Sequence, residues 1–469
     1  MKILLACLAL LAPAGCAQNP VSGQQDFVMM SEAQEIRMGR GADADVRKQY
    51  KVYDSAALQD YVDSVGQQLA KHSHRPNIKY HFTVLDSPEV NAFALPGGYV
   101  YITRGILAYL NSEAELAAVL GHEIGHVTAR HGVRQASAAQ VADVGVAIAS
   151  IFVPQINSSN IGQVVSGALL SGYGRDHELE ADRLGAEYLA RTEYDPHAMI
   201  EVISILKSQE LLDAEIAKQE GREPRRYHGL FDTHPDNDTR LQQVVGEASQ
   251  FTVANPKVEY AKFLQQIDGL VFNEGRDQGV VRNNKFMHLD LDLALKFPQG
   301  WRVQNMPDKL IALSPKADAA IQLKMDKRPS GTPASYARRM TGSDSRVEAL
   351  DIDGLPAAIV TTPAAVAGVI YLDRNTYIIQ GNAKTQAAFA AHRDDMLETI
   401  HSFHTLSEAK RKQARPLVIK LVTARAGDTY ANLAQHSPLE KAAESYLRLI
   451  NGSYPKGEPV PGQYVKIVE

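Results

Sequence analysis

Hydrophobic positions recur at helical spacing in several stretches of the first half of the chain, which is typical of amphipathic helices. We expect helices over residues 31–50, 56–71 and 175–220. Ser31, with Gln34 three residues later, fits a capping box at the start of the first of these helices. The early part of the chain is therefore predicted to be mostly helical.

Two segments between these helices have different patterns. Residues 80–86 alternate like a strand, and residues 91–107 read as two strands joined at Pro96-Gly97-Gly98. Residues 112–135 are rich in helix formers and open on Ser112, with Glu115 three positions later. The pattern predicts a small sheet followed by one long helix.

The pattern changes after about residue 255. Short alternating runs separated by turns, with a helix near residues 386–401, predict a small α+β domain over residues 285–405. Residues 256–284 are expected to be a helical linker. The predicted fold class is α+β and multidomain, with a mostly helical domain over residues 31–255, then the α+β domain, and a small final module over residues 416–469.

Length and charge restrict the function classes. A chain of 469 residues is long enough for two to four domains. Its formal net charge of -5 gives no electrostatic basis for binding nucleic acid.

The N-terminus has the pattern of an export signal. The apolar run Ile3–Ala12 is too short to span a bilayer, which favours a cleaved signal peptide over residues 1–15. Small residues before Cys16 resemble a bacterial lipoprotein signal, which implies a lipid anchor on Cys16. The residues that follow are polar and irregular, which predicts a tether over residues 16–30. Ala17 resembles the sorting default of such lipoproteins, which implies a periplasmic protein on the outer membrane of a Gram-negative bacterium. An ordinary signal peptide with an incidental cysteine is the alternative.

The stretch LGHEIGHVTARH, residues 120–131, carries the strongest chemical signal. His122 and His126 are four residues apart, so a rotation of about 400° places them on nearly the same helix face. Two imidazoles one turn apart can both reach a zinc ion. Glu123 lies about 100° round the helix from His122, where it flanks the metal and could take a proton from an attacking water.

His131 fails the same geometric test. It lies nine residues after His122, which on a continuous helix turns it to the opposite face. We therefore expect a surface position or a contact with a second helix, and not a metal ligand.

A third ligand has to come from elsewhere in the chain. Glu178 and Asp182 are four residues apart and share a helix face, whereas Glu180 points about 200° away from Glu178. One carboxylate could bind zinc while the other accepts the N–H of a ligating histidine. The alternative is a solvated helix face on which these acids pair with arginines.

GHEIGHVTARH followed some fifty residues later by HELEADRLGAEYLA resembles the M48 family of zinc metallopeptidases. The resemblance covers about half the chain and implies a zincin (gluzincin-type) domain that holds one zinc ion per chain. It implies His122, His126 and Glu178 as zinc ligands, Glu123 as the catalytic acid/base and Asp182 as the acid that orients a ligand. In this mechanism Glu123 takes a proton from the attacking water and passes it to the leaving amine.

A second electrophile would help to stabilise the oxyanion, and His234 is our candidate. It precedes Pro235 in THPDNDTR, ahead of a predicted helix. His234 could donate to the oxyanion, or it could bind zinc as a fourth ligand that closes the site. A turn histidine without a role is the alternative.

The strand of residues 91–95, which includes Asn91, Ala92 and Phe93, could hold substrate. Zinc peptidases commonly bind the substrate chain as an added strand on a sheet edge near the metal. Recognition of backbone in this way favours unfolded chains. A core hairpin with no substrate contact is the alternative.

The last segment, residues 416–469, resembles a LysM module of the order strand, helix, helix, strand. The motif residues are Gly427-Asp428-Thr429, Asn451 and Pro461-Gly462-Gln463. The resemblance implies contact with peptidoglycan. A degenerate copy that serves only as a packing module is the alternative.

Together these features predict a zinc endopeptidase, anchored to the outer membrane, that cleaves unfolded or misassembled envelope proteins. The resemblance to periplasmic M48 proteins implies protein quality control and contact with outer-membrane assembly machinery. Two other functions are possible: a chaperone for outer-membrane proteins that seldom cuts, and a peptidoglycan-binding scaffold. Glu123 argues against a pure binder, because binding needs no general base.

Overall fold

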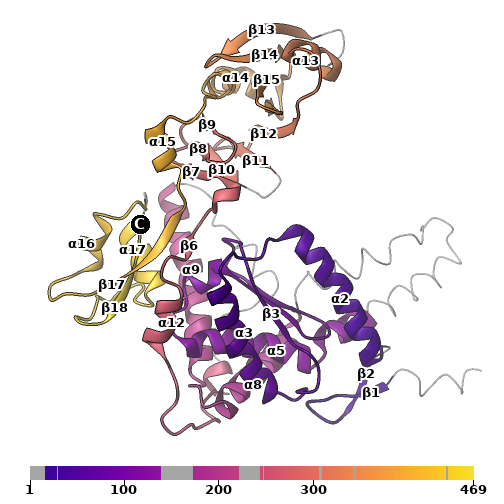
Figure 1. The fold of residues 1–469 in the computed structure, drawn as a ribbon, viewed down its shortest axis with the longest axis vertical. Helices are drawn as coiled ribbons and strands as arrows, with labels where there is room; N and C mark the ends of the chain where they lie inside the picture. The colour runs from indigo at the N-terminus through magenta and orange to yellow at the C-terminus, as the bar shows by residue number, and fades with distance from the viewer. Residues whose placement is uncertain are drawn as a thin grey trace, which may run out of the picture. The chain divides into compact units, whose positions relative to one another are not determined.

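The computed structural model describes residues 16–28, 30–138, 173–220, 243–246, 248–305, 309–341, 345–439 and 442–469. The chain divides into two compact units (Figure 1), Met1–Phe272 with Val418–Glu469, and Asn273–Leu417. Both units mix helices and strands, which confirms the predicted α+β class at that level. The predicted signal peptide lies outside the described residues. No described helix is long and apolar enough to cross a membrane.

The segment predicted to be an irregular tether contains a short hairpin. β1 (Cys16–Gln18) pairs antiparallel with β2 (Gln25–Phe27). In the turn, the side-chain oxygen of Asn19 accepts two backbone N–H groups, and its amide donates to Asp26 at 2.7 Å. The prediction of irregular structure is wrong for these residues, because one polar side chain supplies the hydrogen bonds that order the turn.

Three short strands form the sheet next to the helices of the first unit. The order is β3-β5-β4, with β3 (His81–Leu85) parallel to β5 (Tyr99–Thr103) and β4 (Ala92–Leu95) antiparallel to it. Gly97 lies between β4 and β5 with φ of 80°, a conformation that favours glycine. The predicted strands are confirmed up to Thr103, but the prediction is wrong for Arg104–Leu107, which form a short helix. β4 is one of the two edge strands on the described part of this sheet.

Helices pack on this sheet and on one another, and they contribute most of the core of the first unit (Figure 1). They are α2 (Glu32–Gln49), α3 (Ala56–Lys71), α4 (Arg104–Leu107), α5 (Glu113–Thr128), α8 (Arg175–Arg191), α9 (Ala198–Glu220) and α12 (Tyr260–Gln266). Ser31 and Gln34 form the predicted capping box, and Ser112 accepts the backbone N–H of Glu115. The predicted starts of α2 and α5 are confirmed.

The long helix predicted over residues 112–135 is wrong, because α5 ends at Thr128 and helical structure resumes only at His131. Arg130, at the break, has φ of 56° and donates to Glu35 of α2 at 2.9 Å. Arg75 donates to Glu35 at 2.7 Å and to a carbonyl in the last turn of α5 at 3.0 Å. Charged groups from elsewhere in the fold therefore fix where α5 ends.

The C-terminal segment packs within the first unit. Its order is β17 (Leu417–Thr423), α16 (Tyr430–Ala434), α17 (Ala443–Ile450) and β18 (Tyr464–Val468). β17 lies between β18 and β6 (Val271–Phe272) in a three-stranded sheet. Lys466 is fully buried, and its ammonium donates to the carbonyls of Ala108 at 2.9 Å and Leu110 at 2.7 Å, shortly before α5. The segment is thus tied to the chain that leads into α5.

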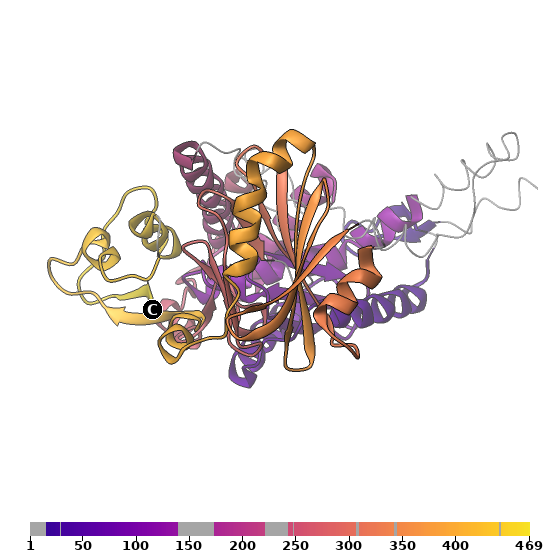
Figure 2. The same cartoon turned by 90° about the horizontal axis from the view of Figure 1, so that it is seen from above.

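The second unit is built on a seven-stranded antiparallel sheet of order β10-β11-β12-β16-β15-β14-β13. Figure 2 shows its two longer helices on opposite sides of this sheet, where α14 contributes Met396 to one apolar cluster and α13 contributes Ala337 to another. The elements are η1 (Arg276–Gln278), β7 (Val280–Arg282), β8 (Lys285–His288), β9 (Leu293–Lys296), β10 (Arg302–Asn305), β11 (Leu310–Leu313), β12 (Ala319–Lys327), α13 (Pro333–Thr341), β13 (Arg346–Ile352), β14 (Leu355–Thr361), β15 (Ala365–Leu372), β16 (Asn375–Ala383), α14 (Gln386–His401) and α15 (Glu408–Gln413). The strands and the helix predicted near residues 386–401 are confirmed.

The helical linker predicted over residues 256–284 is wrong for most of its length. Only α12 and the single turn η1 are helical there, while β6 and β7 each join a sheet. Ile419 of β17 exchanges backbone hydrogen bonds with Gly269 and Leu270, beside β6. A partner strand far away in the sequence therefore makes this segment extended.

Candidate metal centre

α5 and α8 cross at close range, which brings the side chains of two distant stretches together. A Cβ atom on Gly125 of α5 would lie 3.0 Å from the carbonyl oxygen of Ala181 on α8. A residue larger than glycine at this position would push the helices apart. The small residues of both helices therefore set the separation at which their polar groups meet.

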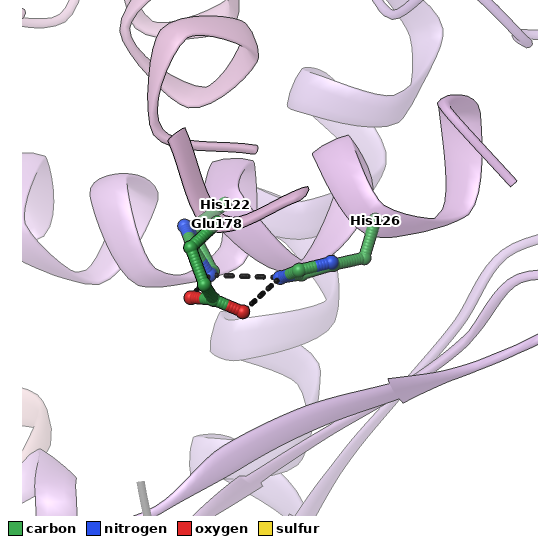
Figure 3. Close-up of side chains that lie close together, drawn as sticks. All are labelled: His122, His126 and Glu178. Carbon is green, nitrogen blue, oxygen red and sulfur yellow. Dashed lines mark hydrogen bonds and ion pairs between the residues drawn. The ribbon is translucent and has the colours of Figure 1, made fainter. Parts of the chain in front are cut away.

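Three ligand-type side chains meet at this crossing (Figure 3). The Nε2 atoms of His122 and His126 lie 3.0 Å apart, and each lies 3.5 Å from a carboxylate oxygen of Glu178. One ligand atom from each of the three lies within 4.8 Å of the other two, and all three residues are buried. Of the described residues, this is the group that could hold a metal ion.

Asp182 holds His122 from the other side of the ring. Its Oδ1 lies 2.8 Å from Nδ1 of His122, so the imidazole donates from Nδ1 and presents Nε2 to the site. Burial lowers the pKa of His122, but Asp182 and Glu178 outweigh burial and raise that pKa to about 9. With the pKa raised in this way, the ring also carries a proton on Nε2, and a metal ion that binds Nε2 would have to displace that proton.

Glu123 and Tyr173 also lie beside the three ligand-type residues. Glu123 is fully buried on α5, next in sequence to His122. The ring of Tyr173 stacks on His126 with centroids 4.1 Å apart. Burial raises the pKa of the Tyr173 hydroxyl, and the charges of Glu123 and Glu178 raise it further. Tyr173 lies next to these acids, and no motif in the sequence indicated it.

His131 lies close to His126, so the prediction that it faces away is wrong. Nδ1 of His131 lies 2.8 Å from Nδ1 of His126, and His131 is fully buried. The prediction assumed one continuous helix, whereas the break after Thr128 redirects the chain. The predicted contact with a second helix is confirmed, because Nε2 of His131 lies 3.0 Å from Glu180 of α8.

Glu180 has partners of its own. Arg134 donates to the same carboxylate oxygen at 3.2 Å. Burial raises the pKa of Glu180, but His131 and Arg134 outweigh burial and hold that pKa at about 2. Glu180 therefore stays a carboxylate, with one imidazole and one guanidinium against it.

β4, which contains most of the predicted substrate strand, lies beside the site. Asn91 and Ala92 are buried, and Phe93 stacks on Tyr101 of β5 with centroids 4.9 Å apart. A small cleft next to His126 is lined by Ala94 and Leu95, the end of the predicted stretch, and by Pro96. Any extended chain added to β4 near the ligand-type residues would meet this later part of the strand.

Two other predicted residues are not placed with this group. His234 lies outside the described residues. Cys16 is the first residue of β1, in the N-terminal hairpin.

The donor set suits a transition metal. Two imidazole nitrogens and one carboxylate oxygen, all buried, form the ligand type of zinc sites that keep one position open. Asp182 adds the carboxylate that commonly orients such a histidine. The residues present therefore fit a bound metal ion.

Comparison with known proteins gives one family. Peptidase family M48 matches residues 56–248. Beta-barrel assembly-enhancing protease of Escherichia coli (strain K12) is 30% identical over 270 residues, which cover 55% of this chain and 53% of that protein. Mitochondrial metalloendopeptidase OMA1 of Schizosaccharomyces pombe is 31% identical over 188 residues, which cover 38% of this chain and 54% of that protein. The chain thus spans about half the length of each of these relatives.

A third relative, metalloprotease YcaL of Escherichia coli (strain K12), is 28% identical over 167 residues, which cover 35% of this chain and 60% of that protein. The matched region contains α5 and α8, so it includes all three ligand-type side chains. Residues 56–248 of this chain therefore belong to peptidase family M48.

Proposed function

We propose that the chain is a zinc endopeptidase that hydrolyses peptide bonds of unfolded or misassembled envelope proteins. The observation that carries the proposal is that the buried side chains of His122, His126 and Glu178 lie together. Glu123 follows His122 on α5. This combination offers a metal site together with a carboxylate for proton transfer. In this proposal the domain around it has the zincin (gluzincin-type) architecture.

Each residue has a defined part in the proposed reaction. His122, His126 and Glu178 would hold the zinc, and Asp182 would fix the tautomer of His122. A zinc ion held there would supply a Lewis acid and make water nucleophilic near neutral pH. Glu123 takes the proton of the attacking water and gives it to the leaving amine.

His234 stays a proposal in two forms, an electrophile for the oxyanion or a gate that closes the metal site. Cleavage by a His234→Ala variant separates them, because loss of an electrophile slows the reaction and loss of a gate speeds it. An unchanged rate would exclude both roles.

Substrate would bind as an added strand on the edge of β4 that no described strand pairs with. The support is the position of β4 at the sheet edge and the cleft between Ala94–Pro96 and His126. Backbone recognition of this kind selects extended chains over folded ones. Equal cleavage of folded proteins within their cores and of unfolded chains would contradict it.

Removal and return of the metal tests the central proposal. Unfolded casein is incubated with the full chain before chelation, after chelation, and after one equivalent of zinc is returned. We expect cleavage to fall to background on chelation and to recover with zinc but not with magnesium, because nitrogen-rich sites favour zinc. Cleavage that survives complete metal removal would contradict the proposal.

A chaperone that binds unfolded outer-membrane proteins and seldom cuts them is the second candidate. The name of one relative, beta-barrel assembly-enhancing protease, supports β-barrel assembly as the setting in which this chain acts. A zinc-loaded chain that binds unfolded chains but does not cleave casein would favour this candidate.

We propose that residues 416–469 form a LysM-like module that holds the protein at peptidoglycan, while a lipid on Cys16 anchors it to the outer membrane. The order β17, α16, α17, β18 supports the module. Deletion of these residues is a poor test, because Lys466 packs against the chain before α5. A scaffold that acts only through this module would not need Glu123.

Sedimentation with isolated peptidoglycan tests the module in the full chain. We expect the protein to sediment with peptidoglycan and to be released by soluble N-acetylglucosamine oligomers. The matched control is the same assay with peptidoglycan digested to soluble fragments. A protein that stays in the supernatant in every case would show that the segment serves only in packing.

A further inference from the structure

The two histidines of the metal centre have different partners behind them. Asp182 contacts His122 directly, while His126 contacts a second imidazole. We propose that His131 and Glu180 are positioning residues that fix His126 for metal binding, through a relay of two hydrogen bonds. The inference rests on the proposed function, because it concerns the same metal site.

The relay connects His126 to a carboxylate through one intervening ring. Nδ1 of His126 lies 2.8 Å from Nδ1 of His131, and Nε2 of His131 lies 3.0 Å from Glu180. Arg134 donates to Glu180 at 3.2 Å and lies 3.6 Å from Asp26. The relay therefore ends on a carboxylate that has its own countercharge.

Metal binding allows only one arrangement of protons along this relay. Nε2 of His126 faces His122 and Glu178, so it must carry the lone pair that binds the metal. The proton of neutral His126 is then on Nδ1 and is donated to Nδ1 of His131. His131 must accept there, so its own proton lies on Nε2 and is donated to Glu180.

The opposite arrangement fails at both ends. If His131 donated to His126, Nε2 of His126 would carry a proton and could not bind metal. His131 would at the same time turn a lone pair toward the carboxylate of Glu180, which can only accept. Glu180 thus selects the tautomer of His131, and His131 selects the metal-binding tautomer of His126.

Packing keeps the rings of the relay in place. His131 has no exposed surface, and His177 of α8 stacks on it with centroids 4.3 Å apart. Tyr173 stacks on His126. Glu180, in contrast, keeps 24% of its side chain exposed. The charged end can therefore be altered with less risk to the fold than the buried ring.

Loss of such a partner typically weakens metal affinity by about 10–100-fold. We expect an effect in this range for His131→Phe, which keeps a ring in the stack but removes both nitrogens. Glu180→Gln keeps the shape and removes the charge, so we expect a weakening nearer the lower end of the range. His131→Asn returns an oxygen that can accept from His126, so it should bind zinc more tightly than His131→Phe.

The experiment measures zinc affinity on the metal-free full chain, by competition with a chromophoric chelator. Glu187→Gln is the matched control, because Glu187 lies on α8 and pairs with Arg183 and Arg191 away from the ligands. Thermal unfolding of each metal-free variant reports the fold separately. The proposal expects weaker zinc binding for His131→Phe and Glu180→Gln, an unchanged control, and recovery of casein cleavage at high zinc.

Unchanged zinc affinity in both His131→Phe and Glu180→Gln would overturn the inference, and zinc-dependent cleavage by the wild type would then leave the proposed function standing. Equal weakening in Glu187→Gln would also overturn it, because the effect would then not be specific to the relay. A wild type that binds no zinc would overturn the inference and the proposed function together.

Discussion

A Glu123→Gln variant is expected to bind zinc like the wild type and to cleave unfolded casein about 10²–10⁴-fold more slowly. The carboxamide has nearly the shape of the carboxylate, so the fully buried position stays filled. It cannot accept the proton of the attacking water, and the reaction loses its general base. Metal content of the purified chains and the rate of casein cleavage are the two measurements.

The control for this comparison is Glu187→Gln, which removes a carboxylate that faces Arg183 and Arg191 on α8. Its cleavage rate should match that of the wild type. If Glu123→Gln were as active as this control, Glu123 would not be the base. If the zinc-loaded wild type were as inactive as Glu123→Gln, the result would instead favour the chaperone hypothesis.

A Glu178→Gln variant is expected to lose both zinc and cleavage. Glu178 is fully buried, and its two carboxylate oxygens each lie 3.5 Å from one of the two Nε2 atoms. Its replacement leaves two imidazoles without a charged third ligand. Zinc affinity should fall by more than the factor of about 10–100 that is expected when only the hydrogen-bond partner of a ligand is removed.

Zinc per chain after dialysis and casein cleavage measure this effect, again with Glu187→Gln as control. Thermal unfolding of the metal-free chain shows whether the variant folds. Wild-type zinc content in Glu178→Gln would mean that another residue is the third ligand. If Glu178→Gln kept its zinc but lost cleavage, Glu178 would have a catalytic role and would not be a ligand.

The effects expected for Glu123→Gln and Glu178→Gln differ from the effect expected when the relay behind His126 is broken. Glu123→Gln should affect the rate alone, Glu178→Gln should affect zinc binding and rate together, and His131→Phe should affect zinc binding with a rate that returns at high zinc. One acts by proton transfer, one by ligation and one by positioning. The three variants therefore distinguish the three roles within one site.

Local features were readable from the sequence because they depend on neighbouring residues. The capping box of Ser31 and Gln34, the cap at Ser112 and the turn at Gly97 are all made by groups within a few positions. The spacing of His122 and His126 on one face is likewise a property of any helix. These features needed no knowledge of the fold.

The carboxylate pair of α8 is an intermediate case. Spacing placed Glu178 and Asp182 on one face, and the family resemblance assigned both to the metal site. Only the crossing of α5 and α8 showed that Glu178 lies between both histidines and that Asp182 contacts His122. Glycine at position 125 lets the helices approach so closely. The sequence held the residues of the contact, and packing decided the contact itself.

The position of His131 was decided by tertiary structure alone. Helical spacing turned it away from His126, and this holds only while the helix continues. Glu35, Arg75 and Arg130 pair across the fold at the end of α5, and the chain turns there. The sequence by itself determined the helix, its cap and its pair of facing histidines, because hydrogen bonds and spacing within one helix are local. Where that helix stops, and which imidazole then stands behind His126, depended on charged groups that only the folded chain brings together.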